Sequence, residues 1–273
     1  MATAMCGKEK TMKYGFIGCG NMGGAIAKAL RCQTADIMIA DPAPNAKALA
    51  ESLGAVYADN DTLVSACDRI FLAVKPQMMK GMLAPLQDLL AEKKPLLITM
   101  AAGLEIAQIQ AFAGCELPII RIMPNTPVSI GKGMITYCRN SLVADDVLAD
   151  WLQDMRDCGR LDALDEKLID AAAALSGSGP AFMYMFIEAL ADGAVACGIP
   201  RAKAYEYAAA TMAGSAELVL ASGQHPGALK DAVCSPGGST IAGVRVLEEN
   251  GFRGAAMDCI IAACNRNKEL GKQ

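Results

Sequence analysis

A glycine-rich hexapeptide near the start of the chain has residue types and spacing that can do chemistry. Gly18-Cys19-Gly20-Asn21-Met22-Gly23 follows the apolar run Tyr14–Ile17 and opens a helical stretch. In such a turn the first glycine permits a tight bend, the second lets the backbone approach a pyrophosphate, and the third lets helix pack on strand. The helix N-terminus adds N–H groups and a positive dipole end. An ordinary glycine turn has the same spacing, but the strand–turn–helix context predicts a dinucleotide site. The predicted site comprises Gly18, Cys19, Gly20, Asn21, Met22 and Gly23.

Two polar residues bear on the choice of dinucleotide. Asp41 ends the second expected strand, about 20 residues beyond the glycines, where an acidic side chain usually binds ribose hydroxyls and repels a 2′-phosphate. Asp41 thus favours NADH, unless it only caps the following helix with Pro42. Asn60, at the start of another expected helix, could donate to a 2′-phosphate or cap that helix. Both NADPH and NADH remain candidate cofactors.

Three further strand ends would line a nicotinamide cleft. Val74-Lys75-Pro76 and Ala101-Ala102-Gly103 each end an expected strand with small or proline-rigid backbone. Lys75 could touch a phosphate or ribose, or could simply be solvated. Asn125 lies in a turn fixed by two prolines and could present its amide to cofactor or substrate.

Apolar runs and helical spacing alternate through the first half of the chain, which indicates βαβ units and a parallel sheet. We predict a Rossmann-type, doubly wound α/β domain whose ligand lies at the carboxyl ends of the strands. The expected strands are Lys13–Ile17, Ile37–Ala40, Ile70–Val74, Leu96–Met100 and Ile119–Met123. The expected helices between them are Met22–Arg31, Ala46–Leu53, Thr62–Ala66 and Met78–Ala91.

Beyond residue 164 the chain is rich in Ala, Leu and Met and predicts an all-helical domain. We therefore expect a dinucleotide-binding domain over 1–164, with 1–11 as a disordered lead-in, and a helical domain over 165–273. The expected helices are Lys167–Ala174, Gly179–Ala196, Arg201–Ala221, Pro226–Val233, Thr240–Asn250 and Phe252–Leu270. Ala181–Ile187 and Ala208–Leu220 are apolar round much of their circumference, so oligomerisation through these helices is expected.

Composition excludes several classes of function. A net charge of −4 gives no electrostatic reason to expect nucleic acid or an anionic membrane as partner. The 11 cysteines are scattered, with no C-x-x-C pair and with His225 as the single histidine. Neither a metal site nor a disulfide framework is expected, and reduced thiols predict a cytoplasmic protein. No signal peptide or membrane span is expected. His225, which precedes Pro226 at a helix start, is expected to be structural.

Two glycine-rich segments in the helical half are more specific. They are Leu175–Ala181, which contains Ser-Gly-Ser-Gly-Pro, and Leu229–Ile241, which contains Ser235-Pro236-Gly237-Gly238-Ser239-Thr240. The second run resembles the signature of pyrroline-5-carboxylate reductases. The chain from Lys13 to about Leu270 is similar to that family, because the glycine motif, both strand-end segments and the His225-Pro226-Gly227 turn fall in the same order.

The resemblance implies an activity and a set of site residues. It implies NADPH- or NADH-dependent reduction of 1-pyrroline-5-carboxylate to L-proline, the last step of proline biosynthesis, by a homodimer or larger assembly such as a decamer. Thr240 would reach the ring nitrogen as the catalytic residue, and Glu166 would lie near substrate. The implied substrate site is Glu166, Ser235, Gly237, Gly238, Ser239 and Thr240. The implied cofactor shell is Gly18 to Gly23, Asp41, Asn60, Ala73, Val74, Lys75, Pro76, Ala101, Ala102 and Gly103.

The resemblance has departures and rivals. Gly223 stands where relatives often have an acidic residue, and Asp41 replaces the serine of some NADPH-preferring members. One rival function is reduction of a six-membered cyclic imine acid or of a 3-hydroxy acid. For the latter, Lys167 is the nearest candidate catalytic lysine, but it lacks the expected glycine–asparagine surroundings. Another rival is a non-catalytic NAD(P)-sensing protein with the same fold.

Overall fold

The computed structural model describes residues 12–31 and 36–270, so the predicted lead-in over 1–11 lies outside the described residues. The chain forms two compact units. The first comprises the residues up to Gly177 together with those from Cys264 onward, and the second comprises Ser178–Ala263.

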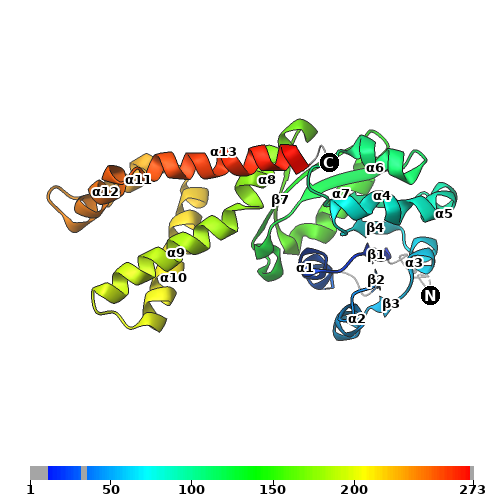
Figure 1. Ribbon diagram of the computed structural model, residues 1–273, viewed down its shortest axis with the longest axis horizontal. Helices are drawn as coiled ribbons and strands as arrows, with labels where there is room; N and C mark the ends of the chain where they lie inside the picture. Colours follow the sequence, from blue (N-terminus) through cyan, green and yellow to red (C-terminus); the bar gives the residue numbers. More distant parts are fainter. Residues whose placement is uncertain (1–11, 32–35, 271–273) are drawn as a thin grey trace, which may run out of the picture. The chain divides into compact units, whose positions relative to one another are not determined.

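The first unit contains a sheet whose eight described strands have the order β3-β2-β1-β4-β5-β6-β7-β8 (Figure 1). The strands from β3 to β6 in this order are parallel, β7 is antiparallel to β6, and β8 is parallel to β7. The order reverses at β1, which lies between β2 and β4 and marks the ligand-binding switch point of a doubly wound sheet. The strands are β1 (Tyr14–Ile17), β2 (Ile37–Ala40), β3 (Val56–Tyr57), β4 (Arg69–Leu72), β5 (Leu96–Thr99), β6 (Ile119–Met123), β7 (Gly133–Arg139) and β8 (Gly159–Ala163).

Helices cover both faces of this sheet, which explains why β1, β4, β5 and β6 are buried along their whole length and are mostly apolar, with Arg69 and Arg121 as the charged exceptions. One hydrophobic cluster joins the sheet to α1 (Asn21–Leu30), α2 (Ala46–Leu53) and α7 (Asp145–Asp154). A second cluster joins it to α3 (Asn60–Ala66), α4 (Pro76–Leu83), α5 (Gln87–Lys93) and α6 (Ile106–Ala113). The predicted doubly wound α/β class is confirmed.

Several details differ from the sequence prediction. The expected helix Met78–Ala91 is two helices, α4 and α5, because a 3-10 turn at Ala84–Leu86 that contains Pro85 separates them. The strands β3, β7 and β8 and the helices α6 and α7 have no counterpart among the expected elements. The burial pattern of β8 is mostly exposed, so it lacks the apolar run that reveals the buried strands.

The second unit is helical, and none of the described strands falls within it. The long helices α9 and α10 pack along each other, and the rings of Phe186 and Phe252 lie 5.5 Å apart between their centroids. Its helices are α9 (Gly179–Ala196), α10 (Arg201–Ser222), α11 (Pro226–Ala232), α12 (Ser239–Glu249) and the first part of α13 (Phe252–Leu270). The helices expected here from sequence are confirmed to within two residues at each end.

The helix α8 (Glu166–Ser176) belongs to the first unit. Its Ile169 and Ala173 pack with Met123 of β6 in a small buried cluster, which ties the helix to the sheet. The compact units therefore divide after Gly177, twelve to thirteen residues beyond the change in composition at 164/165. The domain division at that earlier point stays a prediction.

Candidate active site

The turn after β1 has a geometry that only glycine satisfies. Gly18 has φ +85°, and a Cβ at this position would lie 2.8 Å from the backbone carbon and oxygen of Ala73. A Cβ on Gly23 would lie 2.9 Å from the carbonyl oxygen of Gly18 and 3.0 Å from Cβ of Ala73. Glycine at these two positions therefore lets the turn, the start of α1 and the end of β4 meet at close range.

The N-terminus of α1 is open to a ligand. Gly20 is its N-cap residue and provides no side-chain cap, and the first turn carries no acidic residue. A Cβ on Gly20 would meet no atom within 4 Å, so there is space in front of the backbone there. The start of α1 therefore offers backbone N–H groups and the positive end of the helix dipole without a side-chain cap, and this arrangement fits a pyrophosphate.

Asp41 follows β2 and contacts the same turn. Its Oδ2 accepts a hydrogen bond of 2.6 Å from the N–H of Cys19, and its Oδ1 accepts one of 2.7 Å from the N–H of Ala43. The alternative in which Asp41 only caps the following helix is wrong, because Asn45 is the N-cap residue of α2 and Asp41 holds the glycine turn. Burial, together with the charge of Asp41, raises the pKa of the Cys19 thiol to about 11, so this cysteine stays protonated.

Asn60 is the first residue of α3, and Asp59 is the N-cap. The Asp59 carboxylate accepts a 2.8 Å hydrogen bond from the N–H of Thr62. Hydrogen bonding to the Thr62 side chain, and in second place to this N–H, lowers the pKa of Asp59. The alternative in which Asn60 caps the helix is therefore wrong. Its side chain is half-buried, and its proposed contact with a dinucleotide stays a prediction.

The remaining predicted cofactor residues follow β4 and β5 at the carboxyl edge of the parallel strands. Lys75 is exposed and is the N-cap residue of α4, with Pro76 at the first helical position. The N–H of Ala101, a buried residue, donates to Oγ1 of Thr99 at 3.4 Å. Because β1, β4 and β5 are neighbours, the three segments that follow these strands share one edge of the sheet. Those segments are Gly18–Gly23, Ala73–Pro76 and Ala101–Gly103.

Asn125 uses its amide within the protein. Its Nδ2 donates to the carbonyl oxygen of Ser176 at 3.0 Å, and its Oδ1 accepts from the N–H of Met134 at 2.9 Å. The side chain is 8% exposed. These contacts tie the turn after β6 to the end of α8 and to β7, which favours a structural role over the suggested ligand contact.

Glu166, at the start of α8, lies in a cluster of charges around a buried arginine. Its Oε1 accepts a 2.7 Å hydrogen bond from the N–H of Ile106 and lies 3.5 Å from Nη1 of Arg121. Arg121 is completely buried in β6, and its Nη2 donates to Asp170 at 2.6 Å. The first turn of α8 is thereby joined to β6 and to the start of α6.

Sequence reasoning did not select Arg121, although a signal was present. It is the one charged residue in the apolar run Ile119–Met123. A charge inside a buried strand requires a counter-charge, and acidic residues four apart on a helix, such as Glu166 and Asp170, can supply it. Which helix would supply it could not be read from the spacing.

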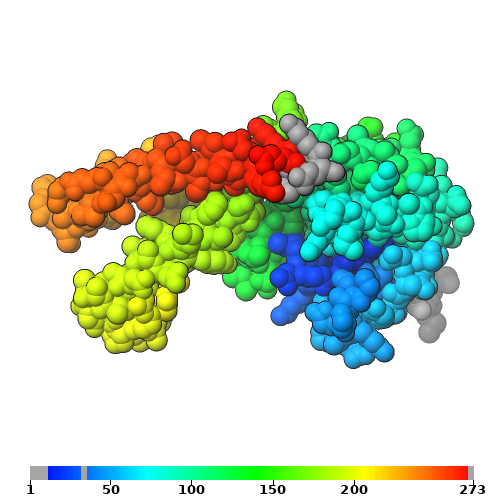
Figure 2. Space-filling model, in the orientation of Figure 1, coloured from blue at the N-terminus to red at the C-terminus, as the bar shows by residue number. Residues whose placement is uncertain are grey.

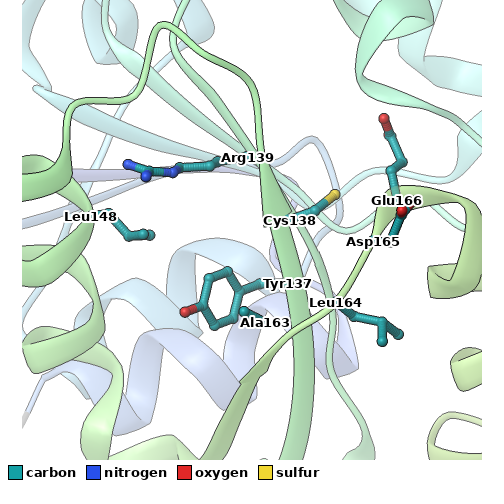
Figure 3. Close-up of a pocket in the computed structure, with 8 residues that line it drawn as sticks. All are labelled: Tyr137, Cys138, Arg139, Leu148, Ala163, Leu164, Asp165 and Glu166. Atoms are coloured by element: carbon teal, nitrogen blue, oxygen red, sulfur yellow. The ribbon is translucent and has the colours of Figure 1, made fainter.

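A hollow of about 500 Å³ lies beside β7 and β8 (Figure 3). Tyr137 and Cys138 project to opposite sides of β7, and Glu166 lies on the same side as Cys138. Burial raises the pKa of the Cys138 thiol to about 11, with a smaller contribution from the charge of Glu166. Of the predicted site residues, Glu166 lines the hollow, whereas none of the glycine turn or of Ser235–Thr240 does, so the hollow contains only one member of the predicted ligand site.

The segment Ser235–Thr240 forms a turn followed by a helix start. The N–H of Gly238 donates to the carbonyl oxygen of Ser235 at 3.0 Å, and Gly237 has φ +69°. Gly238 is the N-cap of α12, it provides no side-chain cap, and the first turn has no acidic residue. Thr240 is exposed in this first turn. The arrangement presents backbone N–H groups to an anion without a net positive charge.

His225 caps a helix. Its Nδ1 accepts a hydrogen bond of 3.0 Å from the N–H of Gly227 at the start of α11. This contact agrees with the expected structural role. Within the part of the chain that the structure describes, no group of three or more His, Cys, Asp or Glu is placed to hold a metal, and no two cysteines form a disulfide. No helix of the described residues is long and apolar enough to span a membrane.

Two family models match separate parts of the chain. Residues 166–270 match the model of the pyrroline-5-carboxylate reductase dimerisation family. Residues 13–103 match the family model described as NADP oxidoreductase, coenzyme F420-dependent.

Similar proteins cover nearly the whole chain. Pyrroline-5-carboxylate reductase of Escherichia coli (strain K12) is 42% identical over 95% of this chain and 98% of its own length. The enzyme of Pisum sativum is 41% identical over 94% of this chain and 95% of its own length. The crystal structure of pyrroline carboxylate reductase from Plasmodium falciparum with NADP bound has a TM-score of 0.87 and 34% identity, covering 97% of this chain and all of that one.

Proposed function

The chain belongs to the pyrroline-5-carboxylate reductase family, and from this premise we propose that it reduces 1-pyrroline-5-carboxylate to L-proline with NADPH or NADH. One observation carries the proposal. Two helix starts, at α1 and at α12, follow glycine-containing turns, lack an acidic first turn and present backbone N–H groups. The first fits the pyrophosphate of a dinucleotide and the second fits the carboxylate of a small acid.

The cofactor supplies a hydride from C4 of its reduced nicotinamide to C5 of the cyclic imine. The protein contributes mainly by positioning. Gly18 to Gly23 hold the pyrophosphate, while the segments Ala73–Pro76 and Ala101–Gly103 shape the cleft at the switch point. The turn Ser235–Gly238 and the start of α12 anchor the substrate carboxylate.

Thr240 is the proposed catalytic residue. A protonated imine accepts hydride far better than a neutral one, so the ring nitrogen must carry a proton when hydride arrives. The hydroxyl of Thr240, in the first turn of α12, binds this nitrogen or orients the water that protonates it. None of the described groups of acidic, His or Cys residues fits a metal, and the proposed chemistry needs none.

We also propose that the chain acts as a homodimer in the cytoplasm. Large hydrophobic side chains are exposed on the helices of the second unit, among them Met185, Leu220 and Met257 at 69%, 68% and 62%. Figure 2 shows atoms of α9, in yellow-green, and of α13, in orange to red, on the visible surface. A second copy of the chain would bury these side chains. Assembly into a decamer stays a prediction. The absence of disulfides among the described cysteines suits a reducing compartment.

The test is oxidation of NADPH and of NADH, followed by absorbance with 1-pyrroline-5-carboxylate as substrate. The wild-type protein should reduce the imine. Thr240→Ala should lower kcat by about 10²-fold or more, because it removes the hydroxyl proposed to serve proton transfer. Thr240→Ser, which retains the hydroxyl, should keep most of the activity. Ser235→Ala should chiefly raise KM for the imine.

Protein that binds the dinucleotide but never oxidises it with this imine would remove the proposed activity. Turnover with a six-membered cyclic imine acid alone would move the substrate to that class. Binding without turnover of either imine would favour a sensing protein. An unchanged KM in Ser235→Ala would count against the carboxylate anchor.

A further inference from the structure

Asp41 holds a carboxylate in one orientation at the end of β2. Each of its two oxygens accepts a backbone N–H, at 2.6 Å from Cys19 and at 2.7 Å from Ala43. Hydrogen bonds to a carboxylate are stronger than neutral ones, so this side chain has little freedom to turn away. Its backbone is held as well, because the hydroxyl of Tyr57 donates to the carbonyl oxygen of Asp41 at 2.9 Å.

The neighbouring strand end adds negative charge on the same edge. β2 and β3 are parallel, with Ile39 opposite Tyr57, so Asp41 and Asp59 each lie two residues beyond a paired position. The ladder continues past the strands, since the N–H of Ala58 donates to the carbonyl oxygen of Ile39 at 3.0 Å. Asp61 follows in the first turn of α3. Carboxylates thus gather at the ends of β2 and β3.

In the turn that follows Asp41, no residue supplies a counter-charge for a phosphate. The four residues after Asp41 are Pro42, Ala43, Pro44 and Asn45, so the turn itself carries no Lys or Arg. Among the ion pairs of the described residues, none involves Asp41. The next cation along the chain, Lys47, is exposed on α2. Folds of this type accommodate a 2′-phosphate with an arginine near this strand end.

From this arrangement we infer that the chain discriminates against NADPH and uses NADH, with Asp41 as the residue that determines the preference. A carboxylate has about four acceptor positions. Two of them are taken by Cys19 and Ala43, and the others can accept the hydroxyls of the adenosine ribose. A 2′-phosphate would instead meet a fixed negative charge. The preference for NADH in catalysis rests on the proposed function, whereas the preference for NADH in binding does not.

The preference is measured by direct binding as well as by turnover. Titration of the wild-type protein with NADH and with NADPH, followed by nicotinamide fluorescence without imine, should give a Kd for NADH lower by about tenfold or more. The ratio of kcat/KM for the two cofactors should favour NADH by a similar factor. A Kd for NADPH equal to or lower than that for NADH would overturn the inference.

Two variants separate the effect of the negative charge of Asp41 from that of its hydrogen bonds to the glycine turn. Asp41→Asn removes the charge and keeps an oxygen that can accept the N–H of Cys19, so NADPH should bind about tenfold more tightly than to wild type, with a smaller change for NADH. Asp41→Ala removes both the charge and the acceptor oxygen, so it should weaken the binding of NADH more than Asp41→Asn does. The matched control is Asp88→Asn, which removes one negative charge from an exposed position on α5 and should leave the NADH/NADPH ratio unchanged.

Each outcome bears on one proposal. If Asp41→Asn changes the Kd of both nucleotides by the same factor, Asp41 only braces the turn and the inference is wrong. If Asp88→Asn shifts the ratio as much as Asp41→Asn, net charge and not this site sets the preference, and the inference again fails. A tenfold binding preference without any turnover of the imine would sustain the inference while removing the proposed function.

Discussion

Cys67 is one of several cysteines whose thiols are buried in the sheet unit. It is 6% exposed and packs with α3 in the hydrophobic cluster on one face. Burial, with a smaller contribution from the charge of Asp68, raises the pKa of its thiol to about 12. A neutral, buried thiol is a poor nucleophile, so the thiols of this kind, which include Cys19 and Cys138, act as small apolar side chains.

These raised pKa values predict a loss of stability at alkaline pH. The folded-state pKa of Cys67, about 12, exceeds its usual value of 9.0, so the folded protein binds this proton more tightly than the unfolded chain. The resulting stability is complete below about pH 9 and is lost as the pH rises toward 12. Urea midpoints measured between pH 7 and about pH 11 should fall for wild type.

Cys67→Ala provides the comparison for this pH dependence. The variant is expected to be less stable at pH 7 because it leaves a small cavity, but its midpoint should fall less steeply above about pH 9. Parallel pH curves for the two proteins would show that Cys67 does not contribute to the alkaline loss.

Gly18 permits a second prediction at the residue scale. Gly18→Ala places a Cβ at φ +85° and 2.8 Å from the backbone of Ala73. The free energy of unfolding should fall by about 2 kcal/mol or more, and NADH binding should be lost, because the turn must open. Urea unfolding and nucleotide titration measure both effects. Gly81→Ala in α4, where a Cβ would meet nothing within 4 Å, should be neutral or slightly stabilising. Equal effects of the two substitutions would contradict this view.

At the scale of elements, α8 is attached to the sheet through charge as well as apolar contact. The N–H of Ile106 at the start of α6, the carboxylate of Glu166 and the buried guanidinium of Arg121 meet in one place. Asp170 completes the cluster with its 2.6 Å bond to Arg121, and Asn267 of α13 donates to the carbonyl oxygen of Asp170 at 3.1 Å. Only Leu104 and Glu105 separate the segment Ala101–Gly103 from α6, so this cluster also supports the proposed nicotinamide cleft.

Glu166→Ala should lower the free energy of unfolding by about 2–3 kcal/mol, since it leaves the N–H of Ile106 without its acceptor and reduces the counter-charge on Arg121. Glu166→Gln retains an acceptor and should cost clearly less. Chemical denaturation of both variants measures this difference. Lys167→Ala, at a neighbouring exposed position, serves as the control.

The same variants test whether Glu166 also binds substrate, as the family resemblance implies. A substrate contact would make Glu166→Gln raise KM for the imine while stability and cofactor KM stay near wild type. If Glu166 instead only supports the cleft, Glu166→Ala should raise the KM for the cofactor, and Glu166→Gln should have a cofactor KM near that of wild type. If Glu166→Ala unfolds at the same urea concentration as wild type, the cluster has no structural role.

For the whole molecule, the main unfavourable feature is the exposure of large apolar side chains of the second unit to water. Leu218 and Leu220 near the end of α10 are 54% and 68% exposed, and Tyr184 and Met185 of α9 are 59% and 69% exposed. A monomer rarely leaves so many large hydrophobic side chains in water. Burial against a second copy removes them from solvent, at about 25 cal/mol per Å² of apolar surface.

Leu220→Lys combined with Met185→Lys should convert the proposed dimer to a monomer, because two charges would have to be buried in the proposed contact. Analytical ultracentrifugation at micromolar concentration measures the change, and imine reduction should fall with it if the site needs both subunits. Val56→Lys adds a charge at a 54% exposed position on β3 of the sheet unit and should leave the assembly unchanged. A double variant that sediments like wild type would place the interface elsewhere.

The sequence by itself determined the class of fold, the order of most elements and the two turns on which the function depends. Buried strands such as Leu96–Thr99 are runs of adjacent apolar residues, and the conformations of Gly18 and Gly237 require glycine, so both leave a local record in the chain. Family membership follows from several such local motifs in one order. Asp41 could also be placed at the end of a strand, because that position depends only on its neighbours.

Only the tertiary structure decided which distant groups meet. The bond from Asp41 to Cys19 spans 22 residues and that from Glu166 to Ile106 spans 60, and no local spacing encodes either pair. The strands β3 and β8 exist because a neighbouring strand offers backbone hydrogen bonds, although their own residues are largely exposed. Local conformation follows from the preferences of adjacent residues, whereas pairing across the fold depends on which surfaces the packed core brings together.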